Sequence, residues 1–426
     1  MPVQDRDAVW AVPLAAGMLL WPALWNGYPI VFADTGTYLS QAINRYIGWD
    51  RPPFYSLFML PLHMTVTTWP VIVAQALLAI WVLRLVSGVR WRWIPLVVAP
   101  LAIGTWLPFL VSQLMPDLFT PLLVLVLCAG TTTWPRVAFA AFAIAAQQSS
   151  LLLWLALLPF TVMAGNGSGS PAMTIRRLFA PAVLAVGALL TVNAIGHHRL
   201  ALSPYGNVFF LARIIYDGPG MAVLRRDCPT SGWRLCAYLD RFPPTSDEFL
   251  WRPDSPIVLA GGHKLVSAEA DAIVAAALRA EPGVEFRAVL GNGAEQLTRY
   301  ASGDGLEPWP VEVTPWIERD FPPAEQTRYR AGLQALGRLT LPPGLGALHA
   351  IVANAGVLAC LALLPLAFSR RLKCGKFLLV VLLVLPASAI ITGGLSTPHD
   401  RYQSRIMWLP PFVAALAMAS LRRVPA

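Results

Sequence analysis

The chain has 426 residues, of which 56% are apolar and only 13% are charged. A soluble domain carries about 25% charged residues, so this composition excludes an ordinary soluble fold and predicts a chain that hides most of its surface in a bilayer. The formal net charge is +9, yet residues 197–345 hold 15 basic and 17 acidic side chains. The basic excess therefore lies in short loops between apolar runs, which argues against a nucleic-acid partner and for contact with membrane lipids.

About ten apolar runs have the length of membrane segments or of short re-entrant pieces. They are 8–25, 70–88, 94–112, 117–134, 137–147, 149–164, 178–196, 346–368, 377–395 and 406–421. No small-residue cleavage site follows the first run, so we expect it to be retained as a span. The run 53–69 is interrupted by prolines and predicts an interfacial piece. Gln147 and Gln148 interrupt a longer apolar stretch and predict two short helices there.

The short loops give the orientation, because cytoplasmic loops are rich in Lys and Arg. With the N-terminus inside, thirteen basic residues fall in inner loops: Arg6, Arg84, Arg90, Arg92, Arg136, Arg176, Arg177, Arg370, Arg371, Lys373, Lys376, Arg422 and Arg423. The short outer loops hold four: Arg45, Arg51, Arg401 and Arg405. This asymmetry predicts a multi-pass protein with both termini in the cytoplasm. The scarcity of lysine, three of the 32 basic residues, hints at a bacterial genome and hence at a bacterial inner membrane.

Three regions follow from this topology. Residues 1–196 form an N-terminal membrane bundle with a first outer loop at 26–69, and residues 346–426 return to the membrane. Residues 197–345 form an extracytoplasmic domain. Its apolar periodicity predicts helices over 266–280, beginning near Ser267, and over 324–339. The fold class is therefore an all-α polytopic membrane protein with a mainly α-helical extracytoplasmic domain.

The cysteines agree with an oxidising outer compartment. Cys228 and Cys236 are the only two of the five that share one aqueous side. We expect a disulfide between them and hence a periplasmic location for the domain, the alternative being two free thiols.

Acidic residues mark a candidate site at the outer face. Four acids outside the large domain and the N-terminal tail fall on that side: Asp34, Asp50, Asp117 and Asp400. Carboxylates avoid the bilayer unless they are used or paired. Both acids also have a structural explanation. Asp34 has the position of an N-cap for a helix over 35–47 that stops at Gly48. Asp117 opens an apolar run, where an acidic side chain interacts favourably with the helix dipole.

The last outer loop combines Pro398-His399-Asp400-Arg401-Tyr402 with Arg405. It predicts either an anion-binding site or a solvated loop in which Asp400 pairs with Arg401. No zinc-ligand spacing, phosphate-binding loop or dinucleotide motif is present in the sequence.

Four motifs in the membrane part resemble the GT-C superfamily of glycosyltransferases, which use polyprenyl-phosphate-linked sugars. They are Ala33-Asp34-Thr35-Gly36-Thr37-Tyr38-Leu39, Arg51-Pro52-Pro53-Phe54-Tyr55-Ser56-Leu57-Phe58, Ser112-Gln113-Leu114-Met115-Pro116-Asp117, and Asp400-Arg401-Tyr402 before a final Pro-containing span. The resemblance covers roughly residues 1–164 and 346–421. It rests on the order of the four motifs and on their common location at the predicted outer face of the membrane.

The resemblance implies transfer of a hexosyl or pentosyl group from a lipid-linked donor to a hydroxyl of a glycan or lipid acceptor in the cell envelope. Asp34 would be the general base. Asp117 would orient the acceptor or bind a divalent cation; no other cofactor is implied. The implied substrate-binding residues are Tyr38, Arg51, Tyr55, His399, Asp400, Arg401, Tyr402 and Arg405.

Two other functions stay open at this point. A non-enzymatic transport or assembly protein for lipid-linked glycans needs arginines near the outer face but no general base. A lipid or acyl transferase needs a Ser or His nucleophile system, which the sequence does not indicate.

Overall fold

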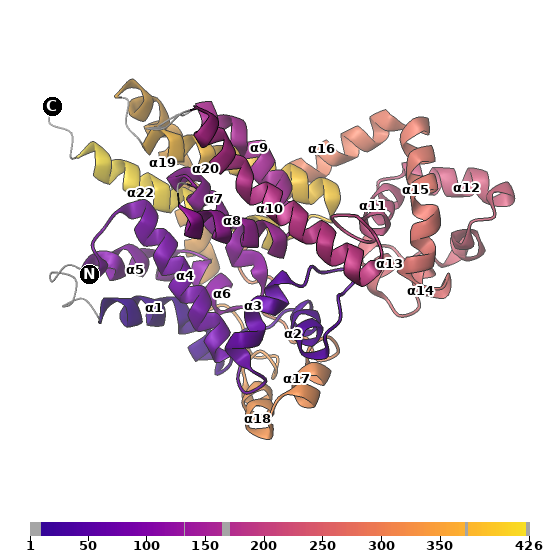
Figure 1. The fold of residues 1–426 in the computed structure, drawn as a ribbon, viewed down its shortest axis with the longest axis horizontal. Helices are drawn as coiled ribbons and strands as arrows, with labels where there is room; N and C mark the ends of the chain where they lie inside the picture. The colour runs from indigo at the N-terminus through magenta and orange to yellow at the C-terminus, as the bar shows by residue number, and fades with distance from the viewer. Residues whose placement is uncertain (1–9, 132, 164–170, 371–373, 423–426) are drawn as a thin grey trace.

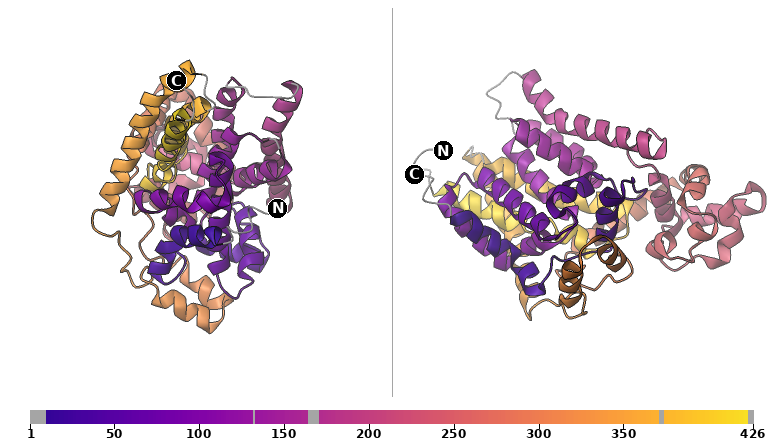
Figure 2. Two further views of the ribbon diagram at one scale, coloured as in Figure 1. Left: turned by 90° about the vertical axis from the view of Figure 1, so that its left-hand side faces the viewer. Right: turned by 60° about the horizontal axis from the view of Figure 1, so that its bottom comes forward.

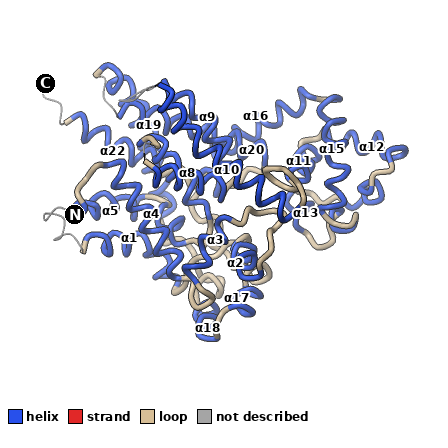
Figure 3. The backbone as a smooth tube through the Cα atoms, in the orientation of Figure 1, coloured by secondary structure: helices blue, strands red, loops and turns tan. Residues whose placement is uncertain are grey.

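The computed structural model describes residues 10–131, 133–163, 171–370 and 374–422. Within these ranges every regular element is helical (Figures 1 and 3), and the only β-type contact is an isolated bridge between Ile30 and Gln113. The all-α prediction is therefore confirmed for the described residues. The inner-loop residues Arg6, Arg371, Lys373 and Arg423, used above for orientation, lie outside them.

The membrane bundle contains helices from both ends of the chain. Its N-terminal helices are α1 (Ala11–Asn26), α3 (Phe54–His63), α4 (Trp69–Ser87), α5 (Ile94–Gly104), α6 (Leu107–Ser112), α7 (Phe119–Ala129), α8 (Trp134–Ala146), α9 (Ser149–Met163) and α10 (Pro171–His197). Its C-terminal helices are α19 (Leu345–Ser369), α20 (Cys374–Leu395), α21 (Asp400–Ser404) and α22 (Leu409–Leu421). Because α20 packs against both α7 and α9, the two halves share one core.

Five helical segments of the described chain are long and apolar enough to cross a membrane: Trp69–Ser87, Leu178–His197, Leu345–Ser369, Cys374–Leu395 and Asp400–Leu421. The other apolar helices of the bundle have 17 residues or fewer. A membrane protein is therefore supported, whereas the larger number of segments stays a prediction.

Two apolar runs are not single helices. The run 94–112 divides into α5 and α6, because Thr105 between them is extended (φ −144°, ψ 167°). The run 117–134 starts as a 3₁₀ turn, η3 (Pro116–Leu118), and α7 ends at Ala129. Gln147 does interrupt the helix between α8 and α9, as its position in an apolar stretch predicts.

Residues 197–345 contribute to two hydrophobic cores. Helices α11 (Gly206–Tyr216), α12 (Pro219–Ser231), α13 (Ser246–Trp251), α14 (Pro256–Leu259) and α15 (His263–Ala280), with the turn η4 (Arg234–Arg241), enclose a core of their own. We call this part, residues 206–280, the outer domain. It lies at one end of the bundle, and α1 begins and α22 ends at the other end (Figures 1 and 2).

The remainder of that section returns to the bundle. Helix α16 (Pro282–Thr298) packs along α20, and residues 300–344, with α17 (Thr314–Asp320) and α18 (Pro323–Ala331), cover the first outer loop. Ile317 and Phe321 belong to the bundle core rather than to the core of the outer domain. Glu325, fully buried, accepts hydrogen bonds from Tyr28 (3.0 Å) and from the Thr68 amide (2.9 Å), which fixes α18 to the bundle.

Three predicted helix boundaries are wrong. Helix α15 begins at His263, and Ser267 lies inside it as a buried residue. The helix expected over 324–339 ends at Ala331, because Gly332 is already extended. In the first outer loop, α2 (Thr35–Asn44) ends at Arg45, which takes up a left-handed conformation (φ 55°) well before Gly48.

Two close helix contacts require glycine. A Cβ on Gly356 of α19 would lie 2.5 Å from Cδ of Pro411 in α22. A Cβ on Gly393 of α20 would lie 2.6 Å from the carbonyl oxygen of Asn292 in α16. The second contact brings the polar helix α16 directly against a candidate membrane span.

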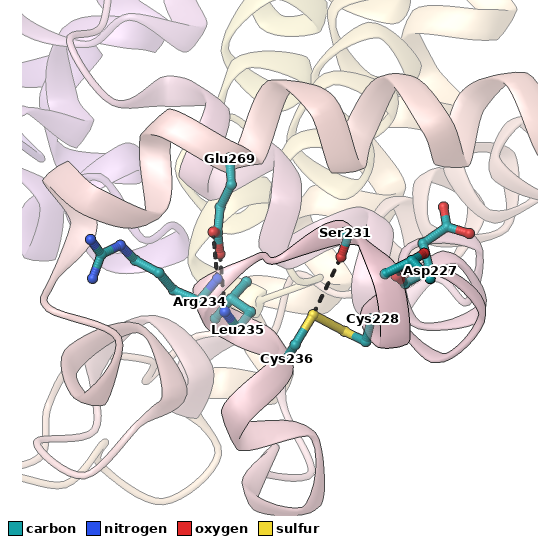
Figure 4. The surroundings of a disulfide bond; sticks show 8 residues. Asp227, Cys228, Ser231, Arg234, Leu235, Cys236 and Glu269 are labelled. Atoms are coloured by element: carbon teal, nitrogen blue, oxygen red, sulfur yellow. Dashed lines mark hydrogen bonds between the residues drawn. A yellow bond between two sulfur atoms is a disulfide. The ribbon is translucent and has the colours of Figure 1, made fainter.

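A disulfide joins Cys228 of α12 to Cys236 of η4 (Figure 4). Beside it, the Glu269 carboxylate of α15 accepts hydrogen bonds from the amides of Arg234 (2.7 Å) and Leu235 (3.1 Å). The loop that the disulfide closes is thereby held against the longest helix of the outer domain.

Candidate functional site

A cavity of about 190 Å³ lies where the first outer loop, the start of α7 and the last outer loop meet. Seven residues implied by the motifs line it: Asp34, Tyr38, Arg51, Asp117, Arg401, Tyr402 and Arg405. They come from segments separated by up to several hundred positions in the chain. The common membrane depth inferred from charge counting thus corresponds to one place in the fold.

The Thr35 side chain joins the two segments that carry the carboxylates singled out by the motifs. Thr35 Oγ1 donates to the carbonyl of Leu114 (3.1 Å) and accepts from the Phe32 amide (2.8 Å), which ties the start of α2 to the segment before α7. Asp34 occupies the N-cap position of α2 but makes no capping hydrogen bond. Its carboxylate is therefore free to face the cavity, as is that of Asp117 in the turn η3.

Ion pairs cross the cavity between these segments. Arg51 Nη2 donates to Asp34 Oδ1 at 2.8 Å, and Arg405 Nη1 donates to Asp117 Oδ1 at 3.2 Å. Arg401 Nη1 lies 3.9 Å from Asp34 Oδ2, too far for a hydrogen bond. The expected pairing of Asp400 with Arg401 is not formed, since Arg401 turns toward Asp34 and the ring of Phe32 (4.0 Å).

Two buried guanidinium nitrogens of cavity-lining residues have no hydrogen-bond partner among the described residues: Arg401 Nη1 and Arg405 Nε. Both atoms are buried, and Arg405 is only 2% exposed. A buried cationic donor without a partner is costly, so such groups are normally satisfied by an anion or by water. The two donors therefore leave hydrogen-bonding capacity for an anion or a water molecule at this wall of the cavity.

Asp50 differs from the other cavity carboxylates. It lines the cavity, yet within the described chain it forms no ion pair with another side chain inside 4.0 Å. Burial raises the pKa of Asp50, and Arg51 only partly opposes this effect. Burial also acts on Asp34, but there Arg51 and Arg401 outweigh it and lower the pKa. Asp50 is consequently the more basic of the two.

A larger groove of about 450 Å³ adjoins the cavity and shares Asp50, Arg51 and Tyr402 with it. Most of its other side chains are apolar and come from the membrane helices α9 and α10 and from the outer domain: Leu151, Leu152, Leu189, Phe209, Phe210, Leu250 and Trp251. The charged cavity thus continues into an apolar space that has a membrane side and an outer-domain side.

Three residues implied by the motifs lie outside the cavity. Tyr55 is fully buried beneath Tyr38 and donates to Gln75 at 2.7 Å. His399 contacts Asp247 of the outer domain (3.1 Å), and Asp400 accepts from the backbone amide of Ala301 (2.8 Å). Their contacts give these residues structural roles around the site.

Sequence reasoning left several cavity residues without a role. Gln147, Gln148 and Ser149 line the cavity from the break between α8 and α9, where they had served only to divide an apolar run. Thr392 and Ser396 line it from the end of α20. The available signal was their polarity within or beside apolar runs.

The donor set does not fit a resident metal ion. No group of three or more His, Cys, Asp or Glu side chains with metal-binding geometry occurs in the part of the chain that the structure describes. In addition, Asp34 and Asp117 are already neutralised by guanidinium groups. Comparison of the chain with protein-family models, with curated proteins and with solved structures gave no match.

Proposed function

We propose that the protein is a membrane glycosyltransferase of the GT-C kind, which moves a hexosyl or pentosyl group from a polyprenyl phosphate to an acceptor hydroxyl at the outer face of a bacterial inner membrane. The observation that carries the proposal is the pair of unpartnered, buried guanidinium donors of Arg401 and Arg405 in a cavity that opens into an apolar groove. A phosphate beside an isoprenoid chain has this combination of charge and apolar surface.

The donor would bind with its phosphate at the two guanidinium groups, whose geometry matches phosphate oxygens. Its isoprenoid chain would lie on the membrane side of the groove, along Leu151 and Leu189. The acceptor would approach from the outer-domain side, where Asp247 and Trp251 line the groove. A glycan or a lipid headgroup that carries a free hydroxyl fits this description.

The reaction is an inverting displacement at the anomeric carbon. The acceptor oxygen forms a bond to this carbon while the bond from the carbon to the phosphate oxygen breaks, and the electron pair leaves with the phosphate. A cavity carboxylate takes the hydroxyl proton. Asp34 holds this role in the motif-based prediction, and Asp50 is a second candidate because it lines both the cavity and the groove.

The orientation is proposed from charge. Thirteen basic residues against four in the short loops favour cytoplasmic termini and a periplasmic outer domain. The disulfide in the outer domain agrees with this side, because such bonds persist in oxidising compartments.

Binding of undecaprenyl phosphate to the full-length protein in nanodiscs tests the proposal directly. We expect binding that undecaprenol, which lacks the phosphate, does not reproduce and that Arg401→Gln weakens by about tenfold or more. A panel of undecaprenyl-phosphate-linked hexoses and pentoses, incubated with envelope lipids and glycans, then tests transfer. Equal binding of undecaprenol and undecaprenyl phosphate would contradict the phosphate site.

The non-enzymatic alternative, carriage or assembly of lipid-linked glycans, uses the same cavity. The ion pairs of Asp34 and Asp117 favour it, because paired carboxylates are poor proton acceptors. Phosphate-dependent binding without transfer to any acceptor in the panel would select this function over the enzyme.

A further inference from the structure

The loop between α20 and α21, residues 396–399, carries Arg401 into the cavity and is held from outside the membrane bundle. Thr397 contacts Ser246 of α13 through their hydroxyl groups (2.7 Å), and His399 contacts Asp247 of the same helix (3.1 Å). These contacts link the phosphate-binding end of the cavity to the outer domain.

Gln296, near the end of α16, makes the most complete contact with this loop. Its Nε2 donates to the carbonyl of His399 (2.8 Å), and its Oε1 accepts from the amide of His399 (2.9 Å). Gln296 is fully buried, so water cannot replace either bond. One amide side chain thereby fixes both backbone polar groups of the residue two positions before Arg401.

Asp304 holds Arg401 itself. Its Oδ2 accepts a hydrogen bond from the backbone amide of Arg401 at 2.9 Å. A short distance along the same segment, the Ala301 amide donates to Asp400 at 2.8 Å. The amide of Arg401 lies in the first turn of α21, where a helix has no partner of its own for such a donor.

The elements that carry these contacts are themselves fixed. Helix α16 packs along α20 so closely that Gly393 has no room for a Cβ against Asn292. Asn292 in turn donates to Asp217 of α11 (3.0 Å). Gln296 therefore has a rigid base that includes both the outer domain and a candidate membrane span.

We propose that Gln296 and Asp304 are positioning residues that hold Arg401 in its phosphate-binding place, and that this is one function of the section between α10 and α19. The inference rests on the proposed function, since it assigns the phosphate to Arg401. Neither residue lines the cavity, so each acts through the backbone of the loop. The side chain of Arg401 has only a long contact with Asp34 (3.9 Å) and ring contacts with Phe32 (4.0 Å) and Tyr402 (5.3 Å), so its position depends on where the backbone of the loop places it.

Binding of undecaprenyl phosphate to the full-length protein in nanodiscs provides the test. Gln296→Leu and Asp304→Leu remove the contacts, and we expect each to weaken binding by at least about tenfold, because a displacement near 1 Å can cost a reacting or binding group up to 10²-fold. Asp304→Asn keeps an acceptor oxygen for the Arg401 amide and is expected to bind within about threefold of the unchanged protein.

Gln326→Leu is the matched control. Gln326 of α18 also uses Nε2 to bind two backbone carbonyls, those of Glu318 and Phe321 (2.8 Å each), but it does not contact the loop before Arg401. Gln326 is partly exposed, so we expect this variant to lower the thermal denaturation temperature less than Gln296→Leu does and to leave binding of undecaprenyl phosphate unchanged.

A double-mutant cycle separates positioning from general destabilisation. If Gln296 acts through Arg401, adding Gln296→Leu to Arg401→Gln weakens binding no further. Additive losses, or unchanged binding in both Gln296→Leu and Asp304→Leu, would overturn the positioning role while the phosphate site stands. If Arg401→Gln itself binds as well as the unchanged protein, the proposed phosphate site fails and the positioning role fails with it.

Discussion

Replacing Asp34 and Asp50 by Asn, one at a time, distinguishes the carboxylate that accepts the proton from the carboxylate that pairs with the cavity arginines. The sequence leaves Asp34 as either a helix cap or a general base. The structure removes the capping explanation, because the Asp34 side chain makes no capping hydrogen bond. The structure introduces a different role for Asp34, namely charge pairing with two arginines, because Arg51 donates to Asp34 at 2.8 Å and Arg401 lies at 3.9 Å. Loss of activity in Asp34→Asn alone would therefore be ambiguous.

Replacement of the two carboxylates should have different effects on phosphate binding. Asp34 competes with a phosphate for Arg51 and Arg401, and opposite charges about 4 Å apart interact by roughly 4 kcal/mol at an effective dielectric constant of 20. The side chains of Asp34 and Arg401, 3.9 Å apart, are 16% and 14% exposed, so solvent screens this pair and we discount that figure to about 1 kcal/mol. Asp34→Asn should then bind undecaprenyl phosphate about fivefold more tightly. Asp50→Asn should bind it almost unchanged.

The rate of sugar transfer should show the reverse order. Asp50 has no ion pair with another side chain inside 4.0 Å in the described chain, and its pKa is raised by burial, so it is the better proton acceptor. Asp50→Asn should lower kcat by about 10²- to 10⁴-fold, the usual contribution of a general base. Asp34→Asn should lower kcat less, because its pKa is already lowered by Arg51 and Arg401 against the effect of burial.

The pH profile provides an independent reading. A general base must be deprotonated, so kcat rises with pH through the pKa of the base. Because the pKa of Asp50 lies above the ordinary aspartate value, the acidic limb should fall within a measurable range and disappear in Asp50→Asn. A normal rate and a retained acidic limb in Asp50→Asn, together with complete loss of transfer in Asp34→Asn, would refute this reasoning and restore Asp34 as the base.

Three further predictions concern stability. Replacing Cys228 and Cys236 by Ser opens a loop of sequence separation 8 and should cost about 2–3 kcal/mol in a denaturant titration; no change on reduction of the native protein would contradict it. Burial, then Asp217, raises the pKa of Glu285, so its stabilising contribution is present below the unfolded pKa and is lost as pH rises through the folded one. Glu285→Gln should therefore raise the denaturation temperature at pH 8 and leave it unchanged at pH 4. Glu325→Ala leaves the buried Tyr28 hydroxyl and Thr68 amide without an acceptor and should cost about 1–3 kcal/mol for each, read from the same titration.

The sequence predicts the site better than the helices around it. Asp34, Asp117 and Arg401 could be placed at one depth because charged residues are rare in apolar runs and the basic loops give a side to each end of a run. The ends of the helices were harder to predict from the sequence. Arg45 ends α2 in a left-handed conformation that its residue type does not favour, and Thr105 divides an uninterrupted apolar run.

The partners of these residues could not be predicted. Arg405 pairs with Asp117 across 288 positions, and Arg401 receives its backbone contact from Asp304, in a stretch with no periodic pattern. Such contacts depend on the tertiary path of the chain, which local propensity does not specify. The division of residues 197–345 between two cores could not be predicted from the sequence either, because both parts have similar composition.

The charge of the cavity indicates how the proposed enzyme would favour the transition state over the bound donor. Asp34, Asp50 and Asp117 are matched by Arg51, Arg401 and Arg405, so the six ionised groups sum to zero net charge, while Arg401 Nη1 and Arg405 Nε still lack partners. The sugar–phosphate diester of the donor carries one negative charge. As the bond to the sugar breaks, the leaving phosphate gains further negative charge. The unpartnered donors would then interact more strongly with the transition state than with the ground state, which is the condition for catalysis.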